Sequence, residues 1–425
     1  MNHFELKGGE LHAEDVPLAR IAAAVGTPVY VYSTATLRRH YAVLRDAFAA
    51  HPALGTPLIA YAVKASPNVE VLRVLVDMGA GADTVSEGEI RRALAAGAPP
   101  ERIVFSGVGK TRAEIAFALK TGVAEVNVES EAELEAVAAV AQELGVRAPI
   151  AFRVNPDVEA GGHAKIATGK AENKFGVSFA QAADLYARAS NNPHLNPVGV
   201  ACHIGSQITD LAPMRAAFLK MRGLVEDLRA GGLKVERLDL GGGLGVPYFH
   251  QPDPPSPADY ATMIADVVGG LEVQLAFEPG RVIAANAGVL LSEVIHVNAR
   301  PEGGRRFLVL DAAMNDLIRP AMYDAFHDIR PVKPRPGEAV PYDVVGPVCE
   351  TGDTFAKQRD LPPLEGGDLV AFMTAGAYGA AMASEYNTRP LAPEVLVEGA
   401  RFAVIRQRPT YEEIIGRDRL DDWVS

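Results

Sequence analysis

Short apolar runs alternate with helical patterns through the middle of the chain. Runs of the kind that form buried strands occur at Leu58–Lys64, Ala80–Val85, Arg102–Ser106, Glu125–Val128, Pro149–Asn155, Val198–Ile204, Leu238–Gly242 and Val273–Glu278. Segments with helical periodicity separate them, among them Val69–Met78, Glu87–Ala96, Arg112–Lys120 and Glu131–Leu144. Strands that alternate with helices predict a parallel sheet.

The expected helix ends carry local signals that agree with this pattern. Capping boxes, in which Ser or Thr is followed three residues later by Glu or Gln, occur at Ser86/Glu89, Thr111/Glu114, Ser130/Glu133 and Ser178/Gln181. Glycines stand where a left-handed residue is expected after a helix, at Gly79, Gly97, Gly122, Gly145 and Gly231. Agreement between local and long-range signals strengthens the prediction.

Eight strands are the number that closes a (β/α)8 barrel. The segment 35–281 has about the 250 residues that are typical of this fold. An open doubly wound sheet is the alternative, but its ligands bind at one switch point. Polar residues follow many different strands in this chain, so we favour the barrel.

The pattern changes after Arg281, where helical periodicity fades and β-rich runs follow. These runs are Val289–His296, Arg306–Leu310, Ala339–Val345, Asp368–Phe372 and Glu394–Val397. They predict a second, all-β domain over 282–425. Residues 1–34 are expected to join it through a strand near Pro28–Tyr32, because a barrel can be inserted into another domain.

Composition narrows the class of protein. The net charge of −12 argues against a nucleic-acid surface. Two cysteines cannot form a disulfide framework, which favours a reducing compartment. We see no signal peptide and no apolar run long enough to cross a bilayer. A cytoplasmic protein without nucleic-acid or membrane partners is therefore expected, and no metal site is predicted.

Lys64 ends the first buried strand, an unusual place for a lysine. One interpretation is that its amine simply reaches solvent where the strand ends. Alternatively, a desolvated lysine has a lowered pKa and forms a Schiff base with a carbonyl compound. The ends of the other strands decide between these, because barrel enzymes carry their chemistry there.

The other strand ends carry polar and glycine residues, and each group has a purely structural interpretation as well. Gly241-Gly-Gly243 follows the seventh strand, where barrels often bind phosphate through backbone N–H groups. His203 could stack on a flat cofactor, and Ser206 could donate to its phosphate. Glu278 follows the eighth strand and is expected to point into the barrel mouth, with Arg281 as a possible ion-pair partner.

A Schiff-base lysine, a phosphate cradle, a ring-stacking histidine and an inward glutamate together indicate pyridoxal 5′-phosphate. Lys64 would hold the cofactor's aldehyde. Glu278 would keep the pyridine nitrogen protonated and thereby make the ring a strong electron sink.

The order of the motifs resembles the diaminopimelate decarboxylases, which are built like alanine racemase and ornithine decarboxylase. The resemblance covers nearly the whole chain. The motifs are Tyr61-Ala-Val-Lys64, Asn173-Lys-Phe-Gly176, His203-Ile-Gly-Ser-Gln207, Gly241-Gly-Gly243, Glu278-Pro-Gly-Arg281, Arg319-Pro-Ala-Met-Tyr323, Gly346-Pro-Val-Cys-Glu350 and Gly376-Ala-Tyr378. Ser66 stands where the family more often has asparagine or alanine, and Thr351 where it more often has serine. Neither residue has an assigned role.

The resemblance implies a role for each matching residue. For the cofactor, it implies Lys64 as the Schiff-base lysine, His203 on the ring, Glu278 at the ring nitrogen, and phosphate contacts from Ser206, Gly243, Gly280, Arg281 and Tyr378. For the substrate, it implies carboxylate binding by Arg281, Arg319 and Tyr323, ammonium binding by Glu350, and a contact from Tyr378. Cys349 resembles the proton donor.

The activity implied is decarboxylation of meso-2,6-diaminopimelate to L-lysine and CO2, the last step of lysine biosynthesis. The active unit implied is a homodimer in which Cys349 and Glu350 come from the partner subunit. The alternatives are a decarboxylase for ornithine, arginine or a carboxylated polyamine, an amino-acid racemase, and a cofactor-carrying protein without catalysis. The pair Arg319 and Tyr323 argues against the other decarboxylases, because their substrates lack a distal amino-acid group. Glu278 argues against a racemase, and the second domain argues against a protein without catalysis.

Overall fold

The computed structural model describes residues 2–159, 174–248, 253–300 and 304–419. The chain divides into two compact units, each of which is described by itself. One contains residues 37–247 and 251–284, and the other contains 1–36, 248–250 and 285–425. We call them the barrel unit and the β unit.

Eight parallel strands of the described chain close into a barrel. They are β5 (Leu58–Ala62), β6 (Gly81–Thr84), β7 (Ile103–Phe105), β8 (Glu125–Val128), β9 (Ala148–Asn155), β11 (Leu195–Ala201), β12 (Arg237–Asp239) and β13 (Gln274–Phe277). Each pairs with the next, and β13 pairs with β5 through Ala276–Leu58 and Phe277–Ile59. The short strand β10 (Val177–Ser178) extends β9. The predicted barrel is confirmed, and the open sheet is excluded.

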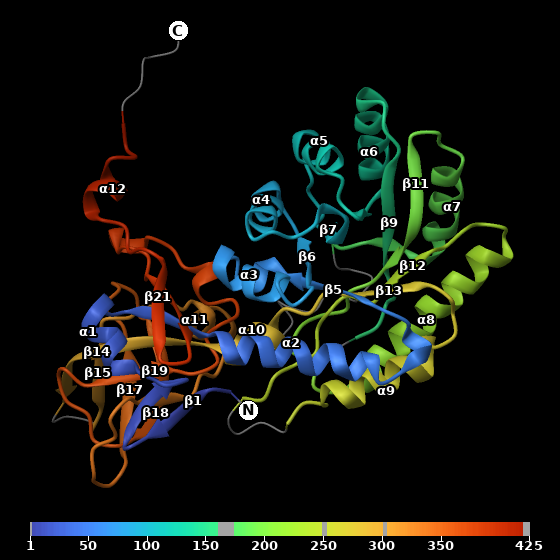
Figure 1. Cartoon of the computed structure of the whole chain (residues 1–425). Coiled ribbons are helices and arrows are strands. Elements are labelled where there is room, and N and C mark those ends of the chain that lie inside the picture. The colour runs from blue at the N-terminus through green and yellow to red at the C-terminus, as the bar shows by residue number, and fades with distance from the viewer. Residues whose placement is uncertain (1, 160–173, 249–252, 301–303, 420–425) are drawn as a thin grey trace. The chain divides into compact units, whose positions relative to one another are not determined.

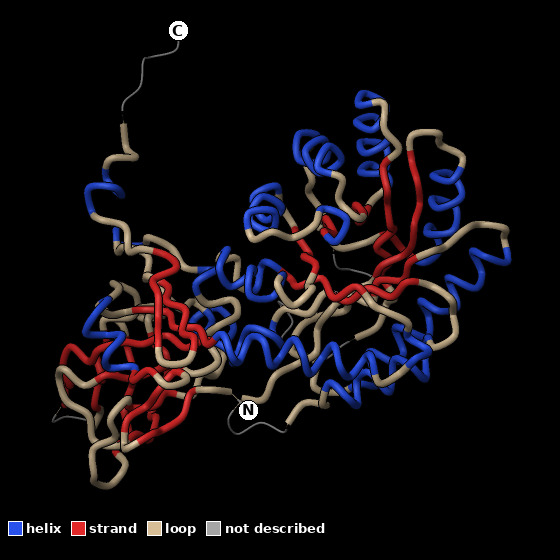
Figure 2. The backbone as a smooth tube through the Cα atoms, in the orientation of Figure 1, coloured by secondary structure: helices blue, strands red, loops and turns tan. Residues whose placement is uncertain are grey.

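Helices surround the strands of the barrel unit (Figures 1 and 2). They are α2 (Thr34–Ala49), α3 (Val69–Val76), α4 (Glu87–Ala95), α5 (Arg112–Thr121), α6 (Glu131–Leu144), α7 (Phe179–Ser190), α8 (Leu211–Ala230), α9 (Pro257–Val268) and α10 (Arg281–Ala284). Leu58, Ala60, Val104 and Ala276 pack together as a small apolar layer. Filling by side chains from different strands is typical of a barrel interior.

The helix ends follow the predicted signals with two differences. Complete capping boxes occur at Thr111/Glu114 and Ser178/Gln181. At Ser86 and Ser130 the serine caps its helix, but the glutamate side chain accepts from the N–H of Val85 or Glu129, one residue earlier. The prediction for Gly231 is wrong: its φ is −75°, and Gly232 takes the left-handed conformation at +81°. The chain therefore turns one residue later than its first glycine suggests.

The described part of the β unit holds two sheets: a small antiparallel one made of its first three strands, and a larger mixed one built around one long strand. Its strands are β1 (Phe4–Lys7), β2 (Glu10–Ala13), β3 (Val16–Pro17), β4 (Val29–Ser33), β14 (Gly288–Ala299), β15 (Arg306–Leu310), β16 (Ile329–Pro331), β17 (Val340–Val345), β18 (Thr354–Leu361), β19 (Leu369–Phe372), β20 (Glu394–Glu398) and β21 (Arg401–Arg406). Strand β14 pairs with β4, β15 and β19. The predicted union of an N-terminal strand with the C-terminal β-rich segment is confirmed.

The described part of the β unit also contains the short α-helices α1 (Leu18–Val25), α11 (Arg319–Tyr323) and α12 (Tyr411–Ile415). Helix α1 buries Leu18 and Ile21 in an apolar core that includes Val29, Val289 and Val395. This core joins strands that are far apart in the sequence.

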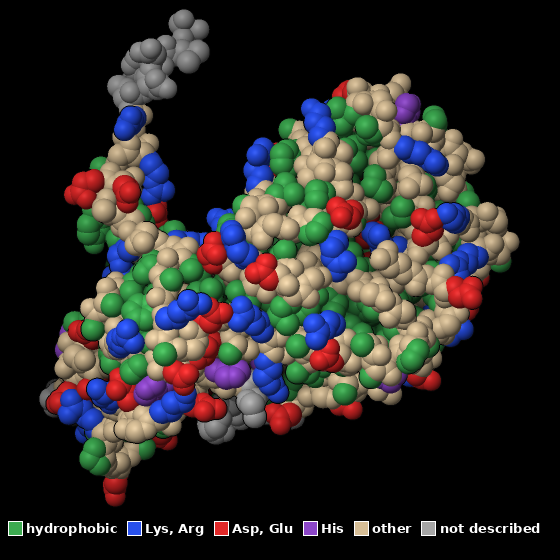
Figure 3. Space-filling model, in the orientation of Figure 1, with side chains coloured by type: hydrophobic (Ala, Val, Ile, Leu, Met, Phe, Trp, Pro, Cys, Tyr) green, Lys and Arg blue, Asp and Glu red, His purple; other side chains and the backbone are tan. Residues whose placement is uncertain are grey.

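Two further features are the distribution of charge on the surface and the hydropathy of the helices. On the face of the barrel unit drawn in Figure 3, basic and acidic side chains are interspersed. No helix in the described part of the chain is long and apolar enough to cross a membrane.

Candidate active site

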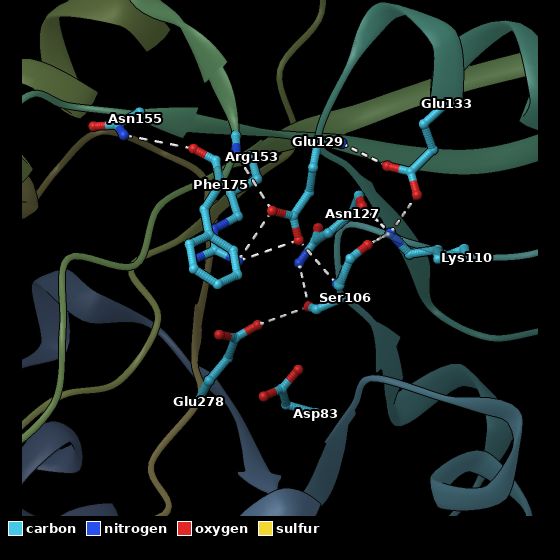
Figure 4. Close-up of polar contacts among 12 residues, drawn as sticks. Asp83, Ser106, Lys110, Asn127, Glu129, Glu133, Arg153, Asn155, Phe175 and Glu278 are labelled. Carbon is cyan, nitrogen blue, oxygen red and sulfur yellow. Dashed lines mark hydrogen bonds and ion pairs between the residues drawn. The ribbon is translucent and has the colours of Figure 1, made fainter. Parts of the chain in front are cut away.

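The carboxyl ends of the barrel strands bring polar side chains to one mouth, because all eight strands are parallel. In chain order these side chains are Lys64, Asp83, Ser106, Asn127, Arg153, His203 and Glu278, with the glycine loop Gly241–Gly243 after β12. Figure 4 shows several of them pointing toward one another. The site is therefore assembled from many strands, as a barrel permits.

The Lys64 amine is held at a buried carboxylate. Lys64 lies in a 3₁₀ turn immediately after β5, and its Nζ donates to Asp83 Oδ2 at 2.6 Å. The Asp83 side chain is fully buried, whereas that of Lys64 is 36% exposed. Asp83 Oδ1 is also buried and has no hydrogen-bond partner in the described structure. The amine is thus fixed at the barrel mouth, which argues against the interpretation that it simply reaches solvent.

Glu89 is a second carboxyl group near this pair. Its Oε2 accepts from the N–H of Val85 at 2.8 Å. Burial raises its pKa to about 7, and the negative charge of Asp83 adds to this effect, while the Val85 N–H and the Lys64 charge oppose it. The group therefore titrates near neutral pH beside Lys64.

The Glu89→Gln variant should change how stability depends on pH. The folded state holds the Glu89 proton up to about pH 7, whereas the unfolded chain releases it near pH 4.3. Stability therefore falls as pH rises through this window, and the variant should lack that loss. We expect it to gain up to about 3 kcal/mol relative to wild type between pH 4 and pH 8, since a tenfold change in proton affinity is worth about 1.4 kcal/mol.

Urea unfolding across this pH range measures the effect. Glu101→Gln removes one carboxylate at an exposed position and serves as the control. The prediction would be wrong if the free energy of unfolding of Glu89→Gln depended on pH as steeply as that of the wild type.

His203 is a neutral imidazole with a defined tautomer. Its Nδ1 lies 3.2 Å from the N–H of Gly242, so Nδ1 accepts and Nε2 carries the proton. Burial holds the pKa of His203 well below its ordinary value, and the charges of Arg153 and Lys64 act in the same direction. A neutral, flat ring at the barrel mouth suits stacking on an aromatic ligand.

The glycine loop requires all three of its glycines. A Cβ atom would lie 2.4 Å from the carbonyl oxygen of Cys202 at Gly241, 2.2 Å from that of Glu278 at Gly242, and 2.6 Å from that of Gly205 at Gly243. Gly241 and Gly243 also have φ of +66° and +111°. The loop packs between the ends of β11 and β13, where any side chain would displace backbone.

Polar groups surround this loop. Asp239 Oδ1 accepts from the N–H of Gly241 at 2.7 Å. The Ser206 hydroxyl accepts from Arg281 Nη2 at 3.1 Å and from Nε at 3.3 Å. Arg281 is 6% exposed, so a buried cation and a hydroxyl lie together beside the loop. The N–H groups of Gly241 and Gly242 donate to Asp239 and His203, whereas the Ser206 hydroxyl and the Arg281 guanidinium are of the types that contact an anion such as phosphate.

Glu278 is a buried carboxyl group with high proton affinity. Burial raises its pKa well above the ordinary value, the charges of Asp239 and Asp83 raise it further, and Lys64 and Arg153 oppose them. Its Oε1 accepts from the Ser106 hydroxyl at 3.4 Å. Ser106 accepts in turn from the Asn127 amide at 3.0 Å. Figure 4 shows the Glu278 carboxyl directed at this group.

A second network fixes Arg153 at the mouth (Figure 4). Both carboxylate oxygens of Glu129 lie 3.2 Å from Arg153 Nη1. Glu129 also accepts from the backbone N–H of Gly107 and Gly176. The Phe175 ring lies 4.7 Å from the Arg153 guanidinium. The segment after residue 173 is thus tied to the ends of β7, β8 and β9.

The β unit holds the other predicted site residues. Arg319 begins α11 and is 6% exposed, and Tyr323 ends that helix. Cys349 is an exposed free thiol, 3.4 Å from the Asn387 side chain. Glu350 Oε1 accepts from the Tyr386 hydroxyl at 2.5 Å, which raises the pKa of Tyr386 to about 12.

The loop that carries Tyr378 is unusual in its backbone. Thr374, Tyr378, Asn387 and Thr388 all have φ between +54° and +58°. Left-handed residues other than glycine cost about 1–3 kcal/mol each and cluster at functional sites. The backbone of segment 374–388 is therefore held in this conformation by the surrounding structure and not by the intrinsic preferences of its residues.

Sequence reasoning found most of the polar groups but missed several of their partners. Asn127, Glu129, Tyr386 and Asn387 were not singled out, and Glu89 was predicted only as a helix-capping residue. Asp83, Ser106 and Arg153 form contacts that strand positions alone do not predict. Asn173, the first residue of the motif Asn173–Gly176, lies outside the described part of the chain. The predicted residues fall into two sets, one in each unit.

Comparisons with known proteins agree on one family. Residues 36–285 match the family described as pyridoxal-dependent decarboxylase, pyridoxal binding domain. The chain is 49% identical over 426 residues to the diaminopimelate decarboxylase of Zymomonas mobilis, covering 99% of each.

Solved structures show the same likeness. The diaminopimelate decarboxylase of Helicobacter pylori in complex with L-lysine has a TM-score of 0.89 and 41% identity, covering 94% of this chain and 98% of that one. The enzyme of M. jannaschii in complex with L-lysine has a TM-score of 0.92 and 36% identity, covering 99% of each.

Proposed function

Because the chain belongs to the pyridoxal-dependent decarboxylases and, among them, to the diaminopimelate decarboxylases, we propose how its residues carry out that reaction. The reaction is decarboxylation of diaminopimelate with lysine as the product. The observation that carries the proposal is the Lys64 amine held at buried Asp83, at the same barrel mouth as Glu278 and the glycine loop. The stereochemical preference for the meso isomer is part of the proposal.

The residues at the mouth fit pyridoxal phosphate. A primary amine suits the aldehyde, a neutral imidazole suits the ring face, and a buried carboxyl group that can share a proton suits the ring nitrogen. The glycine loop leaves no room for a side chain, and a hydroxyl and a buried guanidinium lie beside it. When bound, the cofactor withdraws the electron pair that the departing CO2 leaves behind.

Each barrel residue has a defined task in this proposal. Lys64 Nζ would hold the cofactor's aldehyde, and the barrel mouth would leave that aldehyde accessible to the substrate amine. Glu278 holds a proton at the ring nitrogen, and His203 orients the ring. Ser206, Gly243, Gly280 and Arg281 bind the phosphate, together with Tyr378 of the β unit.

The β unit supplies the proton and recognises the substrate. Cys349 Sγ gives its proton to the carbon atom that has lost CO2, since its thiol is exposed and free. Arg319, Tyr323 and Arg281 bind the substrate's carboxylates, and Tyr378 contacts the substrate. Glu350 binds the distal ammonium group, and the Tyr386 hydroxyl orients its carboxylate.

We further propose a division of labour and a dimer. Segment 35–281 binds the cofactor, while segments 1–34 and 282–425 contact the substrate and a second copy of the chain. Cys349 and Glu350 would then serve the partner's site, which their exposure supports. A reactive thiol that must stay reduced favours the cytoplasm.

A turnover assay tests the function. Purified protein with pyridoxal phosphate should release equal amounts of CO2 and lysine from meso-diaminopimelate. L-Ornithine and L-arginine, which lack the distal carboxylate, should give at least about 10²-fold lower kcat/KM, because they leave buried Arg319 unpaired. Turnover of ornithine in preference to diaminopimelate would overturn the proposal, and racemisation without CO2 release would favour a racemase.

A further inference from the structure

Arg319 is a buried cation whose contacts within the described chain are all with neutral groups. Its Nη1 donates to the Tyr248 hydroxyl at 3.2 Å and to His327 Nε2 at 3.0 Å. Its guanidinium carbon also lies 5.8 Å from the centre of the Tyr248 ring. No carboxylate of a described residue forms an ion pair with it. Because a buried charge normally has a counter-ion, the guanidinium is placed to bind an anion that the described residues do not supply.

His327 is fixed so that it can serve only as an acceptor for Arg319. Its Nδ1 lies 2.9 Å from the Met373 carbonyl oxygen. A carbonyl oxygen only accepts, so Nδ1 must carry the proton and Nε2 the lone pair. The N–H of Met373 donates to the carbonyl of Asp328 at 2.8 Å, which ties the chain beside His327 to the same residue.

The environment of His327 holds the ring rigidly. The side chain is 2% exposed, and the Tyr248 ring stands against it edge-on, with centroids 6.3 Å apart and planes at 89°. The backbone carbonyl of His327 accepts from Arg359 at 3.0 Å. Neither the ring nor the backbone can move away from Arg319 without breaking these contacts.

From this geometry we propose that His327 is a positioning residue that sets the preference for substrates with a distal carboxylate. It orients the Arg319 guanidinium through a neutral acceptor and leaves its charge available for the substrate. A carboxylate in its place would orient Arg319 equally well but would neutralise it. This inference rests on the proposed role of Arg319 in binding that carboxylate.

Three substitutions separate these effects. In His327→Asn the amide can still donate to the Met373 carbonyl but is too short to reach Arg319. In His327→Gln the longer side chain can place its amide oxygen where Nε2 lies. In His327→Glu a carboxylate pairs with Arg319 and competes with the ligand. His296→Asn, at an exposed position in β14, serves as the control.

The readout is the binding of two ligands to the holoenzyme, measured by calorimetry. L-Lysine retains the carboxylate that Arg319 would bind, and cadaverine lacks it. His327→Asn should weaken L-lysine binding about 10- to 100-fold, as expected for a lost hydrogen bond to a charged group. His327→Glu should weaken it at least as much, while His327→Gln should stay within about threefold of wild type. Cadaverine binding should stay the same in all of them.

The outcomes distinguish this inference from the proposed function. If wild-type protein does not prefer L-lysine to cadaverine, the assignment of Arg319 itself fails. If wild type shows the preference but the Gln and Glu variants bind L-lysine equally, His327 has only a structural role and the inference fails. That comparison remains decisive even if His327→Asn does not fold. Equal weakening of both ligands would likewise overturn the inference.

Discussion

Lys64→Ala should abolish covalent attachment of the cofactor and lower kcat by at least about 10³-fold, equivalent to ~4 kcal/mol in the barrier. Alanine offers no amine to the aldehyde, while the neighbouring ring and phosphate contacts remain. Borohydride reduces the carbon–nitrogen double bond between a lysine and an aldehyde to a stable link. After such treatment, mass spectrometry should find the cofactor on the peptide with Lys64 in wild type and nowhere in the variant.

The ion pair with Asp83 makes a second part of this prediction. Removal of Lys64 takes away the amine that lies 2.6 Å from the fully buried Asp83 carboxylate in the wild type. We therefore expect Lys64→Ala to lower the melting temperature, because an unpaired buried charge is costly. The double variant Lys64→Ala with Asp83→Asn should regain stability without regaining activity.

Two results would contradict this assignment. One is a labelled peptide elsewhere in the Lys64→Ala protein with activity retained. The other is recovery of turnover in the double variant, since that would make the loss a consequence of stability. Lys120→Ala, at an exposed position on α5, controls for the loss of one lysine.

The barrel could be predicted from the sequence because each of its signals is local. Helix α6 begins and ends where its periodicity, Ser130 and Gly145 indicate. The glycine loop was recognisable because only glycine tolerates its close backbone contacts, so composition and geometry coincide there. The strand-end residues then followed from the parallel topology.

The partners of the site residues were not predictable in the same way. Glu129 and Arg153 form a hydrogen bond although they are 24 residues apart in the sequence, and His327 and Met373 do so across 46 residues. Such contacts depend on which strands are neighbours and on side-chain direction, and no local pattern records either. Strand β18 was missed for a related reason: its run Ala356-Lys-Gln-Arg-Asp360 is polar, and its place in the sheet comes from pairing with β17.

The protonation states were also beyond the sequence. Nothing in the sequence around Glu278 or Glu89 indicates an unusual pKa. The pKa of each is raised by burial and by nearby carboxyl groups, which only the fold brings together. Likewise, the neutral form of His203 follows from desolvation together with the charge of Arg153. The chemistry of the site therefore depends on the fold as much as on residue identity.

Arg319→Ala should lower kcat/KM for diaminopimelate by roughly 10² to 10³. Without the guanidinium, the substrate's distal carboxylate would enter a buried site unpaired, at a cost of ~3–5 kcal/mol, and ~1.4 kcal/mol corresponds to a factor of ten. Steady-state rates of CO2 release measure the change. Arg319→Lys should fall between wild type and alanine, because lysine keeps the charge but lacks the planar pair of donors.

The matched control for this loss is Arg330→Ala, in β16, where the arginine pairs with Asp328 at the surface and should contribute little. The alanine variant at 319 should also lose its preference for L-lysine over cadaverine in binding, since only the carboxylate distinguishes the two at this position. A near-normal kcat/KM would mean that the distal carboxylate is recognised elsewhere. The buried guanidinium, which has no counter-ion among the described residues, would then need another anion, and the assignment of the β unit to substrate recognition would have to rest on Tyr323, Glu350 and Tyr378.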